Sequence, residues 1–253
     1  MALSLVNFCI RLKPSYANFK SEDVIIKMGK LKLHQYLNLL IAITAILSLC
    51  IFSLNVTACG LLHKKQRATF DDIKHFFVAQ RKEVITFIGY SGAEYEDKAT
   101  MLEKASDILS KFDPSRTIVN IGATRDGIGA VYELAKHRGF ITTGIVSTRT
   151  KQSNKISPCV DYVFFVEDQT WGGFIEGSDQ LSPTSRAIVE NSHILFGIGG
   201  GKVERDELIA AKRLRKNVHF FPADMNHKKA RENALKKGLP VPKKFGGAAG
   251  EVF

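Results

Sequence analysis

Three glycine-rich loops, each directly after a short apolar run, hold the residues of this chain best suited to chemistry. Glycine lets a phosphate approach the backbone closely, and the first turn of a helix offers N–H groups that lack intrahelical partners. We therefore expect the loops to bind a nucleotide or a phosphosugar. The expected ligand contacts are Gly89, Ser91 and Gly92 in the first loop, Gly122, Ala123, Thr124, Gly127 and Gly129 in the second, and Gly199, Gly200, Gly201 and Lys202 in the third.

Short apolar runs alternate with helix-like segments across residues 84–225. This alternation predicts parallel β-α-β units, which make a Rossmann-like α/β sheet flanked by helices and place the three loops at one edge. Ligands of such sheets bind outside the carboxyl ends of the strands. We expect strands at 84–88, 117–121, 140–146, 160–166, 193–196 and 217–221, and helices at 94–112, 129–138, 183–191 and 203–215.

Residues 167–182 form a polar, glycine-containing insertion between the fourth strand and the next helix. A loop of this length inside a compact domain is commonly a functional lid. Its Trp171 either stacks on the base of a nucleotide or caps the domain, and Tyr90 in the first loop either stacks or packs. His193 has no partner at metal-ligand spacing, so we expect a structural role for it. The sequence predicts neither a metal site nor a cofactor.

Residues 37–62 contain no charged side chain and are long enough to cross a bilayer core of about 30 Å. A basic leader at 1–36 precedes them. We expect an amphipathic helix at 63–83 to connect this segment to the Rossmann-like domain at 84–225. A basic tail at 226–253 lacks periodicity, and we expect it to be mobile.

The run from Val56 to Cys59 resembles the end of a bacterial lipoprotein signal, in which the cysteine is lipidated and becomes the mature amino terminus. The alternative is an uncleaved, single-pass amino-terminal anchor. Either reading attaches the protein to a membrane and leaves open whether Met1 or Met28 is the start. Cys159 is then the one cysteine of the soluble part, so we expect it to be an unpaired, half-buried thiol.

The formal charge of +11 raises the question of nucleic acid. Many of the cations flank the apolar segment or lie in the tail, where anionic lipid is the more usual partner. Nucleic acid is therefore an unlikely partner of this chain.

The second and third glycine loops resemble those of the family of LOG (lonely guy) phosphoribohydrolases, also called lysine decarboxylase-like proteins, within the wider SLOG group. The resemblance covers residues 84–225. It is carried by the strand and loop from Ile118 to Val131, by Arg186 one helix before the third loop, and by the segment from Gly199 to Glu207. That segment stands where the family has Pro-Gly-Gly-x-Gly-Thr-x-x-Glu, with Glu207 or, one residue earlier, Asp206 at the glutamate position.

The resemblance implies a nucleotide site in which Arg186 and Glu207 are the catalytic residues for cleaving an N-glycosidic bond. The opening proline of the signature is glycine here and the Gly-Thr pair is absent, which favours binding over hydrolysis. We therefore expect a membrane-attached nucleotide-binding protein. The alternatives are a nucleoside monophosphate phosphoribohydrolase and, since the SLOG group includes DNA-processing proteins, a single-stranded DNA-binding protein. The family also makes a homodimer an expectation.

Overall fold

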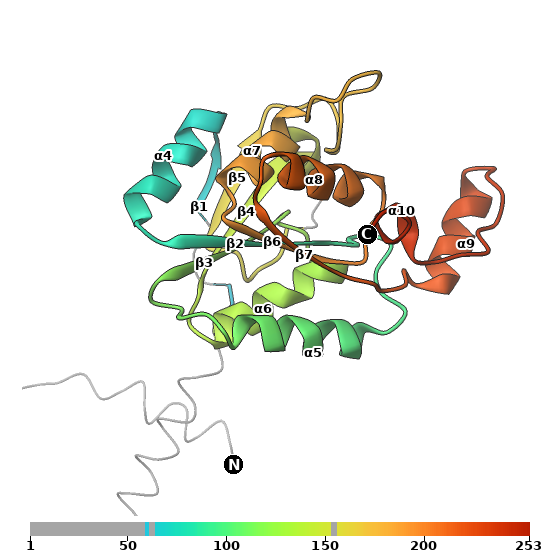
Figure 1. Cartoon of the computed structure of the whole chain (residues 1–253), viewed down its shortest axis with the longest axis horizontal. Helices are drawn as coiled ribbons and strands as arrows, with labels where there is room; N and C mark the ends of the chain where they lie inside the picture. Colours follow the sequence, from blue (N-terminus) through green and yellow to red (C-terminus); the bar gives the residue numbers. More distant parts are fainter. Residues whose placement is uncertain (1–58, 61–63, 153–155) are drawn as a thin grey trace, which may run out of the picture. The chain divides into compact units, whose positions relative to one another are not determined.

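The computed structural model describes residues 59–60, 64–152 and 156–253, which belong to one compact unit, 57–253. Its described strands form a seven-stranded sheet in the order β1-β5-β4-β3-β2-β6-β7 (Figure 1). The strands are β1 (Lys64–Arg67), β2 (Glu83–Gly89), β3 (Thr117–Ile121), β4 (Ile141–Ser147), β5 (Tyr162–Val166), β6 (Ile194–Ile198) and β7 (Asn217–Phe221). The helices are α4 (Phe70–Gln80), α5 (Lys98–Leu109), α6 (Val131–His137), α7 (Pro183–Asn191), α8 (Lys202–Arg213), α9 (His227–Lys236) and α10 (Gly247–Gly250), with 3₁₀ turns η1 (Gly127–Ala130) and η2 (Thr148–Gln152).

Every neighbouring pair of strands is parallel, so the carboxyl ends of all seven lie at one edge. From β2 the chain steps outward through β3, β4 and β5, and then returns to place β6 on the other side of β2. The reversal creates a switch point beside β2, where open α/β sheets bind their ligands. The predicted Rossmann-like α/β class is confirmed.

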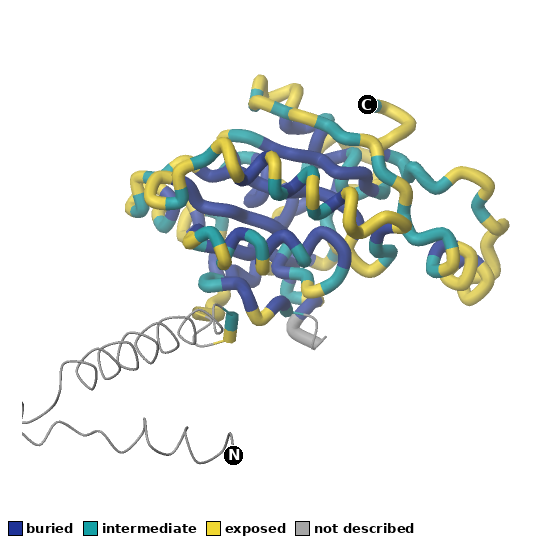
Figure 2. Tube along the Cα trace, turned by 90° about the horizontal axis from the view of Figure 1, so that it is seen from below, coloured by how far each residue is buried: buried dark blue, intermediate teal, exposed yellow. Residues whose placement is uncertain are grey.

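Helices cover both faces of the sheet: α5 and α6 lie on one face and α4, α7 and α8 on the other (Figure 1). Adjacent residues of β2 serve opposite faces, because Val84 packs in the cluster that contains Ile73 of α4, and Ile85 packs in the cluster that contains Met101 of α5. Burial on both sides explains why the strands read as continuous apolar runs. Figure 2 shows this buried layer running through the strands.

The predicted limits of β3, α7 and β7 agree with the structure residue for residue. Local signals explain α7, since the Ser182 side chain accepts from Ser185 N as the N-cap and Pro183 occupies the first turn. The expected helix at 63–83 is wrong at its start. Residues 64–67 form the edge strand β1, which pairs with β5. The helix α4 begins at Phe70, and its N-cap Thr69 forms a capping box with Asp72.

The expectation of a mobile basic tail is also wrong, because 226–253 contains α9 and α10. Helix α10 lies against the third glycine loop, where Ala249 is fully buried and its N–H donates to Gly200 O at 3.1 Å. The glycine- and alanine-rich composition of this stretch, which lacks a periodic apolar pattern, allows that close approach.

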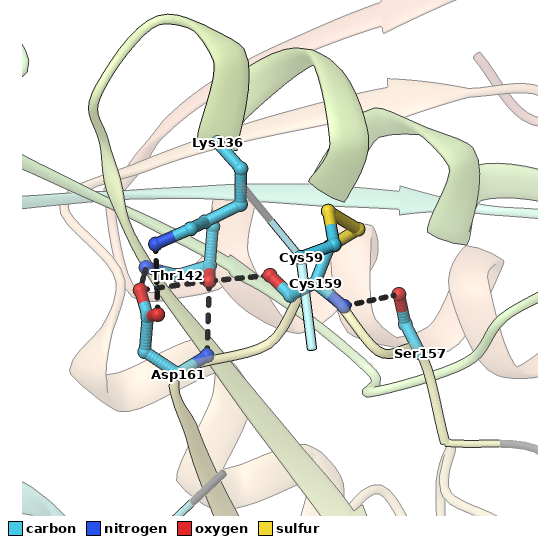
Figure 3. Close-up of polar contacts among 6 residues, drawn as sticks. All are labelled: Cys59, Lys136, Thr142, Ser157, Cys159 and Asp161. Atoms are coloured by element: carbon cyan, nitrogen blue, oxygen red, sulfur yellow. Dashed lines mark hydrogen bonds and ion pairs between the residues drawn. A yellow bond between two sulfur atoms is a disulfide. The ribbon is translucent and has the colours of Figure 1, made fainter. Parts of the chain in front are cut away.

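Cys59 and Cys159 form a disulfide with a Cα–Cα distance of 4.4 Å (Figure 3). The expectation that Cys159 is an unpaired thiol is therefore wrong. Hydrogen bonds hold the turn around it: Thr142 Oγ1 donates to Cys159 O at 2.7 Å, and Cys159 N donates to Ser157 Oγ at 3.3 Å. Asp161 continues the network by accepting from Lys136 Nζ at 2.8 Å. A sulfur in a disulfide cannot also carry a thioether-linked lipid, so this disulfide and the expected lipidation of Cys59 exclude each other.

Within the described ranges, no helix has the length and apolar character needed to span a bilayer. Apart from Cys59 and Gly60, the apolar segment 37–62 lies outside the described residues, as does the leader at 1–36.

We predict that reducing the disulfide destabilises the fold by about 2–4 kcal/mol, because the bond closes a loop with a sequence separation of 100. Urea denaturation of the full-length protein with and without a reductant measures the loss. The Cys59→Ser and Cys159→Ser variants should each have the free energy of unfolding of the reduced wild type, and the reductant should not change it. Equal stability of the wild type in both conditions would contradict the prediction.

Candidate functional site

A cavity of about 440 Å³ lies at the carboxyl ends of β2, β3 and β4, and the first turns of α7 and α8 help to enclose it. This volume falls within the range of small-molecule sites. The polar residues of its wall are Thr86, Ser91, Thr124, Asp126, Ser147, Thr150, Thr184, Glu204 and Glu207.

The structure places six of the expected residues on this wall: Gly89, Ser91, Gly92, Gly122, Thr124 and Glu207. A Cβ added at Gly92 or at Gly122 would meet no other atom within 4 Å. Space is therefore open at the two positions where the first and second loops border the cavity. These loops are the parts of the site at which a ligand has access to glycine backbone.

The other expected glycines have a structural reason instead. A Cβ at Gly127 would lie 2.0 Å from Tyr90 O, and one at Gly129 would lie 2.0 Å from Thr124 O. Gly199 has a φ of 58° and borders the Tyr90 ring. None of these positions tolerates a side chain, because neighbouring protein fills the space. The expected residues that the cavity wall omits are Ala123, Gly127, Gly129, Gly199, Gly200, Gly201, Lys202 and Arg186.

Arg186 points away from Glu207, contrary to the arrangement that the family resemblance implies. Its Nε donates to Glu190 Oε1 at 2.9 Å on the same helix, and its guanidinium lies 4.5 Å from the centre of the Phe70 ring. Both partners belong to the packing between α7 and α4. The helical spacing of Arg186 and Glu190 explains the pairing, since residues four apart share a helix face.

Tyr90 packs and does not line the cavity. Its ring meets Tyr95 edge-on at 5.3 Å, and its hydroxyl lies 3.2 Å from Ala223 O and 3.3 Å from Phe245 O as a donor. Burial raises the pKa of Tyr90 to about 12. His193 is structural as expected, because its Nδ1 accepts from Val84 N at 2.9 Å.

A buried carboxyl group is the main chemical feature of the wall. Burial raises the pKa of Glu207 to about 8, and the nearby charges of Glu204 and Asp206 act in the same direction. Ser185 Oγ donates to Glu207 Oε1 at 2.6 Å and accepts from Gly173 N at 2.7 Å. Glu207 is therefore mostly protonated at neutral pH and offers the cavity a neutral acid.

The amino end of α8 already holds a carboxylate. Glu204 Oε2 accepts from Gly201 N at 2.8 Å at the third glycine loop. This is the glutamate half of a capping box, since Gly201 has no side chain to form the other half. An anionic ligand at this helix end would compete with the Glu204 side chain for the N–H group of Gly201. Burial already disfavours negative charge at this place, because it raises the pKa of Glu204. A phosphate therefore fits the first and second loops better than the third.

The insertion at 167–182 is folded onto α7 and α8. Asp168 accepts from Thr170 N at 2.8 Å and Thr184 N at 2.9 Å, and Asp206 Oδ2 accepts from Phe174 N at 3.0 Å. Trp171 from this loop lines the cavity. The insertion therefore borders the cavity, and its expected role as a functional lid stays a prediction.

Sequence reasoning missed Thr184 and Glu204 on the wall, and it missed Ser185, which is not on the wall but donates to Glu207. Ser185, the partner of Glu207, and Glu204, the cap of Gly201, looked like ordinary helix residues. Thr184 Oγ1 is buried and makes no hydrogen bond of regular geometry within the described part of the chain, although the Thr184 side chain helps to lower the pKa of Asp168. The only sequence signal for this group is its place in the first turn of α7, directly after the insertion.

The described residues contain no group of three or more His, Cys, Asp or Glu side chains able to hold a metal ion. The cavity wall carries three carboxyl groups, from Asp126, Glu204 and Glu207, and no Lys or Arg side chain. The wall thus lacks the cationic surface that the phosphate backbone of nucleic acid requires. Because no cationic side chain is present, an anionic ligand of this cavity must rely on backbone N–H groups.

No protein-family model matches the chain, and no curated protein matches it. The solved structures that are similar in fold include the following two. The molybdenum cofactor carrier protein of Chlamydomonas reinhardtii is 20% identical with a TM-score of 0.41, over 55% of this chain and 76% of that one. The molybdenum cofactor binding protein of Rippkaea orientalis is 17% identical with a TM-score of 0.43, over 64% of this chain and 88% of that one. Likeness at this level assigns no ligand to this chain.

We predict that the stability of the wild type falls as pH rises from about 4.5, the usual pKa of a glutamate, to about 8, the pKa of Glu207 in the fold. In that interval the folded chain holds a proton that the unfolded chain has released, so raising the pH favours unfolding. The loss should be on the order of a few kcal/mol.

Denaturation at a series of pH values tests this dependence. Glu207→Gln, which stays neutral and keeps an acceptor for Ser185, should flatten the profile between these limits. Glu103→Gln, at an exposed position of α5, should keep the wild-type profile. Parallel profiles for the wild type and Glu207→Gln would show that Glu207 is not the buried acid responsible.

Proposed function

We propose that this protein binds a nucleotide or a nucleotide derivative in the cavity beside β2, with the anionic group at the first and second glycine loops. The observation that supports this most directly is the open space at Gly92 and Gly122, at the switch point of a parallel sheet. Backbone N–H groups at such loops suit a phosphate, and they compensate for a wall without cationic side chains. The resemblance of residues 84–225 to the SLOG group supports the same ligand class.

Glu207 favours a ligand that accepts a hydrogen bond. A protonated carboxyl is both donor and acceptor, and at neutral pH it does not repel an anion as a carboxylate would. Anion affinity should therefore fall as the pH passes through about 8, where Glu207 ionises.

The test is a thermal-shift screen of the full-length protein against nucleoside mono- and diphosphates, sugar nucleotides and ribose 5-phosphate. A ligand at 100 times its dissociation constant should stabilise the fold by about 3 kcal/mol. Gly122→Val places a side chain in the open space and should abolish the shift without unfolding the protein. Gly250→Val, at a glycine with equally open surroundings outside the cavity, is the matched control.

Arg186→Ala serves as a second control, because Arg186 lies outside the wall and should not alter the shift. The proposal fails when no ligand of the panel shifts the wild type, or when Gly122→Val binds as well as Gly250→Val.

A phosphoribohydrolase is the second candidate function, and the buried acid Glu207 favours it. A carboxyl group with a pKa of about 8 is suited to protonating a leaving group at neutral pH. Arg186 offers no support for this activity, because it pairs with Glu190. Chromatography of the nucleotides that bind in the screen would detect a released base, and Glu207→Gln should then stop the release while binding persists.

We also propose that the part of the apolar segment 37–62 that precedes Cys59 attaches the domain to a membrane as an uncleaved anchor. The sequence supports the segment itself, and the Cys59–Cys159 bond favours an anchor over lipidation. Disulfides persist in oxidising compartments, so the bond also favours a domain on the outer side of the membrane. Mass spectrometry of alkylated, unreduced protein from native membranes should yield a linked peptide containing both cysteines. A lipid-modified Cys59 peptide would overturn this proposal.

A further inference from the structure

Trp171 is an exposed aromatic side chain on the wall of a cavity. It is the one tryptophan of the chain, it is 57% exposed, and it lines the same cavity as Thr184 and Glu207. Exposing a large aromatic surface costs hydrophobic free energy that packing elsewhere would recover. The position of Trp171 therefore calls for a reason other than packing of the domain.

The backbone on both sides of Trp171 is fixed. Before it, Thr170 Oγ1 donates to the buried Asp168 Oδ1 at 2.8 Å and accepts from Gly172 N at 3.1 Å. After it, Gly173 N donates to Ser185 Oγ at 2.7 Å. A Cβ at Gly172, where φ is 118°, would lie 2.8 Å from Ser185 Oγ. The loop thus presents the indole from a rigid support on α7.

Arg149 holds the indole from the neighbouring turn η2. Its guanidinium lies 4.9 Å from the centre of the Trp171 ring and donates from Nη1 to Gln169 O at 2.9 Å. One side chain therefore binds both the ring and the backbone of the same loop. Such cation–π contacts stabilise an exposed ring without removing it from solvent.

The wall also offers two groups that suit the polar edge of a ring. Thr184 Oγ1 is buried and makes no hydrogen bond of regular geometry within the described residues, although the Thr184 side chain helps to lower the pKa of Asp168. The Glu207 carboxyl is held by Ser185 on the same side. The open glycines Gly92 and Gly122 belong to different loops, those after β2 and β3.

We propose that Trp171 is the stacking surface for a planar heteroaromatic ring of the ligand, and that Arg149 is a positioning residue for the indole. Thr184 and Glu207 would meet the edge of the ring, and the first two glycine loops would hold the anionic end. The inference rests on the proposed function, to which it adds the class of ligand: a flat, nitrogen-containing ring joined to an anionic group.

Tryptophan fluorescence detects a ligand that stacks on Trp171, because all tryptophan fluorescence of the chain comes from this residue. The full-length protein is titrated with AMP, with neopterin as a bicyclic ring without phosphate, and with ribose 5-phosphate as an anion without a ring. AMP or neopterin should change the emission at saturation. Ribose 5-phosphate should shift the melting temperature with little change in emission.

Affinities of the variants come from calorimetry. Trp171→Ala should weaken the binding of the ring ligand about tenfold and leave ribose 5-phosphate unchanged, since stacking on an aromatic side chain contributes on the order of 1–3 kcal/mol for each base. Trp171→Phe should restore most of the affinity. Leu235→Ala, at a position of α9 that is 67% exposed, is the matched control for loss of an exposed apolar side chain.

Arg149→Ala should lower the fluorescence anisotropy of the unliganded protein, because the indole loses its partner, and should weaken ring binding about threefold. The stacking proposal is overturned when the wild type binds AMP or neopterin and Trp171→Ala binds it equally well. Binding of ribose 5-phosphate alone also overturns it and leaves the proposed anion site standing. Absence of binding by every probe overturns the proposed function together with the stacking surface.

Discussion

The site depends on the interlocking of three backbone loops around Tyr90. Ile128 N donates to Tyr90 O at 2.7 Å, which fixes the second glycine loop to the first. The Tyr90 ring lies against Gly199 of the third loop, and its hydroxyl reaches the segment that carries α10. A side chain at Gly127 or Gly199 would separate these loops. Many of the glycines therefore permit the close approach of protein to protein, and only the remainder face a ligand.

Electrostatics restrict what the cavity accepts. The α8 amino end, which would attract an anion, is occupied by the Glu204 side chain, which accepts from Gly201 N. The buried Glu207 avoids a second unpaired charge because its pKa is raised to about 8. The pocket thus combines neutral or internally compensated acids with open glycine backbone. This combination distinguishes it from the cation-lined phosphate sites that a net charge of +11 suggests.

The Cys59–Cys159 disulfide supports a wall of the ligand cavity, so the redox state of the compartment affects the site. Cys159 belongs to a turn whose Ser157 N donates to Ala123 O at 2.9 Å, directly behind the second glycine loop. Thr124, next in that loop, forms an isolated antiparallel bridge with Ile156. The covalent bond to Cys59 thereby supports a wall of the cavity from the beginning of the domain. A compartment that reduces the bond would remove this support.

The sequence by itself determined the α/β class, the limits of β3, α7 and β7, and the glycine loops, because alternating apolar runs and local capping signals act over a few residues. It also identified Glu207, Gly122 and the insertion around Trp171 as parts of the site. Tertiary structure decided the rest. Arg186 turned toward Glu190 and Phe70, residues 64–67 became an edge strand, and Cys59 met Cys159 across a separation of 100 residues. The Arg186–Glu190 pair follows from helical spacing. The contact of Arg186 with Phe70, the edge strand and the disulfide depend on elements distant in the chain, and no local pattern indicates which of these partners lies nearest.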